Sequence, residues 1–71
     1  MKKYLYGMRV RPFMPLTYPK KGFEKCLEEK EITEEIKVNC DKKYFDILQY
    51  NEKLDESTLI DFQMNFIMEI L

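Results

Sequence analysis

The chain must fold around a small core, and its sequence shows no clear disulfide framework or metal site that would stabilise this core. With 71 residues it forms one domain, residues 1–71, and a folded monomer of this size buries only roughly 60% of the surface that its unfolded chain exposes. Small domains often compensate with disulfides, a metal or oligomerisation. The chain has no histidine and only two cysteines, Cys26 and Cys40, too few ligands for a zinc site. We therefore expect free thiols, no metal or other cofactor, and a homo-oligomer, either a dimer or a tetramer.

Charge is distributed unevenly along the chain, although the net charge is only −1. Residues 1–23 contain six basic residues and no acidic residue, whereas residues 24–71 contain all 13 acidic residues and six basic ones. A field of one sign over the first third favours an anionic partner. The alternative is that this basic segment pairs with the acidic remainder, either within one chain or between subunits.

The first predicted element is a strand over residues 3–11, which alternate with a period of two. Tyr4 and Tyr6 fall on one face of this strand, and Arg9 and Arg11 fall on the other. The stretch that follows contains all three prolines of the chain. Because proline cannot donate to a strand ladder, this stretch predicts an irregular loop.

Three further segments lie in the middle of the chain. Residues 23–40 are rich in Glu and Lys, which favour a helix, but their apolar residues recur at even spacing. We expect there a polar, partly solvent-facing strand that ends near Cys40. Residues 41–43 predict a turn, and residues 44–50, with the sequence YFDILQY, predict another strand.

A C-terminal helix is predicted over residues 55–70. Asp55 is a good N-cap, Leu54 can contact Leu59 across this cap, and apolar residues recur at helical spacing as far as Ile70. The helix has more apolar surface than one small sheet can cover, which again suggests contact between subunits. The expected fold class is α+β: a small antiparallel sheet of about three strands with one C-terminal helix packed on it.

Composition argues against several classes of function. Without histidine the commonest general base is missing, and two glycines cannot form a phosphate-binding loop, so we expect no enzyme. A net charge of −1 argues against a polynucleotide-binding protein. No stretch approaches the ~18 apolar residues of a membrane span, and no apolar segment follows the basic N-terminus as in a signal peptide. We expect no membrane partner and a cytoplasmic location.

The candidate ligand site lies in the basic first third. Arg9 and Arg11 share a strand face, and guanidinium groups bind phosphate oxygens in a two-pronged geometry. Nearby aromatic residues can stack on a nucleotide base. Tyr4 and Tyr6 face away from the arginines and would have to come from a neighbouring subunit. The complete candidate set is Arg9, Arg11, Phe13, Tyr18, Tyr4 and Tyr6.

Several motifs resemble a family of short phage and mobile-element proteins that we connect with anti-CBASS sponges. The motifs are YLYGMRVRPF at residues 4–13, PKKGF at 19–23, KYFDIL at 43–48 and the capped helix after Leu54. The chain departs from the family pattern at Pro12 and over residues 14–16, and its acidic stretch 24–42 is longer. The resemblance therefore does not specify which nucleotide is bound.

The resemblance implies an immune-evasion sponge that acts in the cytoplasm of a bacterial host. Such a protein binds cyclic di- or oligonucleotide messengers without cleaving them, blocks CBASS signalling, and builds its pocket between subunits. The alternative is a small protein–protein inhibitor of a host defence protein, of the anti-restriction or anti-CRISPR type. Composition does not separate these two functions.

Overall fold

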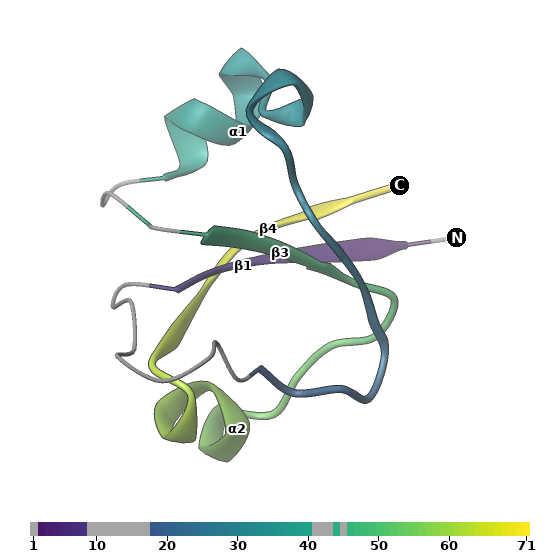
Figure 1. The fold of residues 1–71 in the computed structure, drawn as a ribbon, viewed down its shortest axis with the longest axis vertical. Helices are drawn as coiled ribbons and strands as arrows, with labels where there is room; N and C mark the ends of the chain where they lie inside the picture. The colour runs from purple at the N-terminus through teal and green to yellow at the C-terminus, as the bar shows by residue number, and fades with distance from the viewer. Residues whose placement is uncertain (1, 9–17, 41–43, 45) are drawn as a thin grey trace.

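A computed structural model describes residues 2–8, 18–40, 44 and 46–71 (Figure 1). Within them, four strands form an antiparallel sheet in the order β2-β3-β1-β4. The predicted α+β class is therefore confirmed, whereas the expected three strands are four. The elements in chain order are β1 (Lys3–Met8), β2 (Phe23–Cys26), the 3-10 helix η1 (Glu29–Glu31), α1 (Glu34–Asn39), β3 (Asp46–Tyr50), α2 (Glu56–Asp61) and β4 (Met64–Ile70).

The two central strands are β1 and β3. Their period-two patterns place apolar side chains on both faces of the sheet, which suits a central position. On β1, Tyr6 belongs to the apolar cluster on one face of the sheet and Leu5 to the cluster on the other; their exposed fractions are 1% and 0%. On β3, Leu48 and Ile47 divide between the same two clusters. Both predicted strands are confirmed within the described residues, the second beginning at Asp46 rather than at residue 44. The predicted positions 9–11, the turn 41–43 and most of the proline-rich loop lie outside the described residues.

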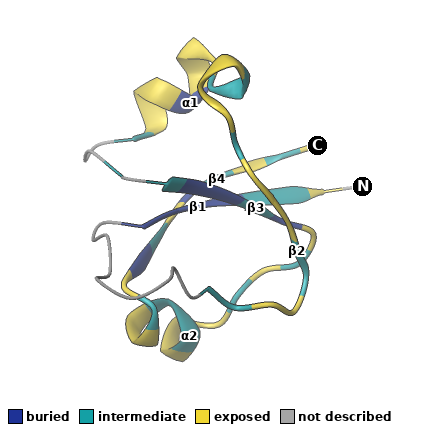
Figure 2. Ribbon diagram, viewed as in Figure 1, coloured by how far each residue is buried: buried dark blue, intermediate teal, exposed yellow. Residues whose placement is uncertain are grey.

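The sheet is covered on both faces, by one short helix each (Figures 1 and 2). The α2 face carries a core of buried residues from β1, β3 and β4, against which Leu54, Leu59 and Phe62 pack. The α1 face carries a second core, in which Ile36 of α1 is buried. The prediction of a single helix on one face is therefore wrong, because both faces of the central strands are apolar and each needs a cover.

The segment from Phe23 to Cys40 differs from the predicted strand. It forms the short β2, then η1, then α1. The side chain of Thr33 caps α1 by accepting a hydrogen bond from the backbone N–H of Ile36 at 3.3 Å. The first turn of α1 carries Glu34 and Glu35, which favour the positive end of a helix. Local capping thus outweighs the even spacing of the apolar residues.

The predicted C-terminal helix over residues 55–70 is wrong over more than half of its length. Asp55 does cap α2, because its carboxylate accepts a hydrogen bond from the Thr58 N–H at 2.9 Å. However, α2 ends at Asp61, and Gln63 adopts a φ of 53°. This left-handed conformation reverses the chain, which then returns as β4 along the edge of the sheet.

A β-bulge explains why β4 resembles a helix in its sequence. Tyr6 pairs with Phe66 and Leu5 with Met68, so Ile67 is an extra residue in β4. Phe66 therefore faces the α2 core, whereas Ile67 and Met68 both belong to the α1 core. Three consecutive apolar residues result, and together with the residues of α2 they imitate helical spacing.

Candidate functional site

The structure separates the predicted ligand residues. Arg9, Arg11 and Phe13 lie outside the described residues. Tyr4 is half-buried and packs against the α2 core. Tyr18 is also half-buried, with its ring centroid 4.3 Å from that of Phe23.

Tyr6 is a core residue. It is 1% exposed, and its ring makes edge contacts with Tyr50 and Phe66, each with 5.6 Å between centroids. Its hydroxyl oxygen accepts a hydrogen bond from the backbone N–H of Leu54 at 2.9 Å. Burial raises the pKa of the Tyr6 hydroxyl, so this group stays protonated. The hydroxyl therefore holds the chain just before α2 against the sheet. The buried ring leaves no face open for a stacked base.

An aromatic row crosses the α2 face of the sheet and ends at an exposed ring. Tyr50, at its centre, is fully buried, and its hydroxyl donates a hydrogen bond to the carbonyl of Pro19 at 2.7 Å. At the β4 end of the row, Phe66 is 46% exposed. The row is formed by Tyr18, Phe23, Tyr50, Tyr6 and Phe66.

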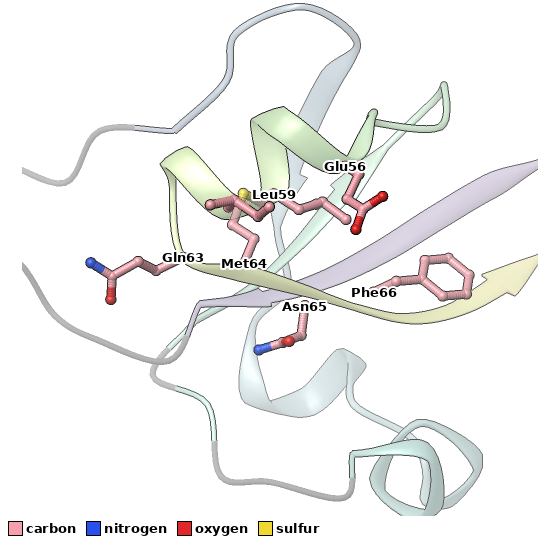
Figure 3. A pocket seen from close by; sticks show the side chains of 7 residues that line it. Glu56, Leu59, Gln63, Met64, Asn65 and Phe66 are labelled. Carbon is pink, nitrogen blue, oxygen red and sulfur yellow. The ribbon is translucent and has the colours of Figure 1, made fainter.

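A groove lies between α2 and β4, beside the exposed ring of Phe66 (Figure 3). Its volume is about 560 Å³. Ile60 lines it from α2 and is 68% exposed, so two large apolar side chains face solvent at one place. The complete lining is Glu56, Leu59, Ile60, Gln63, Met64, Asn65 and Phe66. One carboxylate, that of Glu56, among apolar side chains suits the binding of an apolar group that also carries a hydrogen-bonding or charged group.

Among the described residues, the segment that forms this groove is acidic. Residues 54–71 contain four acidic residues, Asp55, Glu56, Asp61 and Glu69, and no basic residue. Only Glu69 has an ion pair within the described residues, with Lys2 at 3.4 Å. Hydrogen bonds from the side chain and backbone of Thr58 lower the pKa of Asp55. The carboxylate of Asp55, which caps α2, therefore stays charged at neutral pH.

A second hollow of about 480 Å³ lies at the basic end of the sheet. Lys2, Lys3 and Lys53 line it, but Lys3 donates to the carboxylate of Glu24 at 2.5 Å. This hydrogen bond lowers the pKa of Glu24, which therefore stays ionised beside the lysine. Lys2 is paired with Glu69, as described above. The alternative in which basic and acidic parts of one chain pair with each other is thus confirmed for Lys2 and Lys3.

Sequence reasoning missed Ile60 and Phe66 as candidate functional residues. Both belong to the apolar pattern that predicted a long helix, in which most of the stripe would be core. The polar residue Gln63 interrupts this apolar pattern and could have indicated a turn there. A turn at Gln63 divides the predicted helix into two elements, which places Ile60 and Phe66 on different elements. Among the described residues no group of three or more potential metal ligands is present, and no helix is long and apolar enough to cross a membrane.

A comparison with curated proteins and another with solved structures gave no match. A comparison with protein families matches residues 1–69 to the family described as Defence against restriction A C-terminal. The resemblance to anti-CBASS sponges is therefore wrong: the short motifs that suggested it are outweighed by a match over nearly the whole chain. On this match, the chain belongs to the Defence against restriction A C-terminal family.

Proposed function

We propose that this chain is a non-catalytic binding domain that protects against host restriction by contacting a host protein through the groove between α2 and β4. The family description supports the anti-restriction role. The observation that carries the proposal is the pair of exposed apolar side chains, Ile60 and Phe66, on opposite walls of one groove. Clustered apolar groups of this kind mark protein interaction sites when polar residues surround them.

The shape of the groove favours a protein partner over a small ligand. Its lining combines a helix wall with a sheet edge, and Phe66 stands on a rigid base because its ring contacts the buried Tyr6. Rigid aromatic anchors at the centre of an apolar patch supply most of the binding energy in many protein interfaces. Val38 of α1 is also exposed, but it does not line this groove.

The proposal can be tested by the plating efficiency of unmodified phage on bacteria that carry a panel of restriction systems. Cells that express the chain should be protected against at least one system. Ile60→Lys and Phe66→Lys should each reduce this protection by about tenfold or more, the effect of losing an interface anchor. Val38→Lys is the matched control, since it removes an exposed apolar side chain from the opposite face of the sheet.

Circular dichroism must show that all three variants are folded. Protection that survives both groove substitutions would contradict the groove as the contact surface. A chain that protects against no restriction system would contradict the function itself.

A further inference from the structure

β4 is an open edge of the sheet. It is the last strand in the order β2-β3-β1-β4, and within the described part of the chain no strand pairs with its outer side. In an antiparallel ladder every second residue of an edge strand directs its N–H and C=O away from its neighbour. Such groups are a template for pairing with another extended chain.

The two edges of the sheet differ in how well they are protected. β2 has four residues, of which Glu24 and Lys25 are charged, and a bulge interrupts its pairing with β3. β4 has seven residues and only one charged residue, Glu69. Short length and charges protect edges from unwanted pairing. Both edge strands contain a bulge, so the greater length and lower charge of β4 make it the more open edge.

The bulge at Ile67 defines the part of β4 that can accept a partner. It breaks the alternation of the strand, so a regular added strand fits on one side of it only. The part from Met64 to Phe66 is uncharged and borders the groove. A strand added there would run along the foot of α2, with alternate side chains directed into the groove.

We propose that the α2–β4 groove takes a basic, extended segment of a partner protein, which adds a strand to β4 at Met64–Phe66. Charge selects this occupant: Glu56 lines the groove, and neither Glu56 nor Asp61 has an ion pair within the described residues. Lysine or arginine side chains of the segment would lie near Glu56 and Asp61, and its apolar side chains would contact Ile60 and Phe66. The inference rests on the proposed function and specifies the chemistry of the partner.

The same charges disfavour a second copy of this chain at the same place. Pairing β4 with β4 about a two-fold axis would bring two acidic α2 helices to the same face of one continuous sheet, where like charges repel. A basic partner would instead be attracted by Glu56 in the groove.

Three fluorescent peptides of about nine residues test the inference by anisotropy with the full chain. The first is basic and prone to strand formation, KVKVTVKVK. The second, EVEVTVEVE, reverses the charge, and the third, KVKPTPKVK, keeps the charge but cannot form a strand ladder. The first peptide should bind about tenfold or more tightly than either of the others, and about 0.5 M salt should weaken its binding several-fold.

Substitutions of two matched glutamates test whether the peptide binds in the groove or is attracted by the overall negative charge of the chain. Glu56→Gln should weaken binding of the basic peptide about two- to fivefold, as expected for one exposed ion pair. Glu35→Gln should change nothing, because Glu35 occupies the first turn of α1 on the other face of the sheet. Amide NMR signals that shift on titration should centre on Met64–Phe66.

Three results would overturn the inference: no binding of the basic peptide at about 1 mM, equal binding of the proline peptide, or equal effects of the two glutamate substitutions. A chain whose β4 edge is already closed by a second copy would also bind no peptide and would equally overturn the inference. The plating assay is independent of these results. Loss of protection in Ile60→Lys without any peptide binding would leave the proposed function intact and refute only the basic strand.

Discussion

The close contact between Gly7 and the ring of Tyr44 makes a quantitative prediction. A Cβ atom added to Gly7 would lie 2.5 and 2.6 Å from the Cδ1 and Cδ2 atoms of Tyr44. These atoms belong to a ring that packs against the α1 core, so they cannot retreat like the end of a flexible side chain. Gly7 itself is buried in β1, between β3 and β4.

The expected cost of Gly7→Ala follows from two opposing effects. Overpacking a well-filled site costs ~1–3 kcal/mol. Replacing glycine by alanine also restricts the unfolded chain, which offsets this by ~0.4–1 kcal/mol where the backbone suits alanine. The backbone of Gly7 has no positive φ, so this gain applies. The net loss in free energy of unfolding should be about 1–2 kcal/mol.

A double-mutant cycle read by urea denaturation tests the origin of this cost. Tyr44→Ala destabilises the protein by itself, but in its background Gly7→Ala should become neutral or slightly stabilising. The coupling free energy between the two positions should therefore be ~1–3 kcal/mol. A Gly7→Ala protein as stable as the wild type, or one whose cost persists without the Tyr44 ring, would refute the reasoning.

Gly22 supplies the control. It has a φ of +77°, so Gly22→Ala is strained by its backbone wherever Tyr44 lies. Its cost should add to that of Tyr44→Ala within about 0.5 kcal/mol.

Three further predictions concern the core, the α2 cap and the assembly. Tyr6→Phe should lower the free energy of unfolding by ~1–3 kcal/mol in urea denaturation, because it leaves the Leu54 N–H without its acceptor; an unchanged midpoint would contradict this. Asp55→Ala should lower the melting temperature at pH 7, and this difference should begin to shrink as the pH falls below about 4. The sign follows from the lowered pKa of Asp55: its contribution is complete above the unfolded-state pKa and is lost as the pH falls through the folded-state pKa. A difference that persists at lower pH would show that the carboxylate is not the cap. Sedimentation at micromolar concentration should give a dimer or tetramer, and a single 8.7 kDa species would contradict the predicted oligomer.

The strands that sequence reasoning predicted are those buried on both faces. β1 and β3 are central, so their apolar residues alternate between the two cores, and the period of two survives in the sequence. β2 is different: Phe23 is half-buried, and the three residues after it are exposed. A strand with one buried residue leaves no periodic signal.

The helices were misjudged because each has only six residues. Six residues span less than two turns, too few for a helical period to be recognised. What the sequence does contain is the caps. Asp55 was recognised as a cap, whereas Thr33, followed by Glu34 and Glu35, is an equally good start that the even spacing of Ile36 and Val38 concealed. The bulge at Ile67 then extended the apparent apolar stripe of α2 into β4.

The uneven charge of the chain predicted an anionic ligand, but the fold changes what that charge means. Lys2 and Lys3 stand in the basic first third, yet β1 carries them to Glu69 and Glu24, which are distant in sequence. The charges of these two lysines are therefore paired with carboxylates of the same chain. Glu56 and Asp61 of α2 have no basic partner among the described residues, so the uncompensated charge beside the groove is negative. A sequence reveals how many charges it has, whereas the strand order decides which of them cancel. At the α2–β4 groove this reverses the sign of the partner that the described surface attracts.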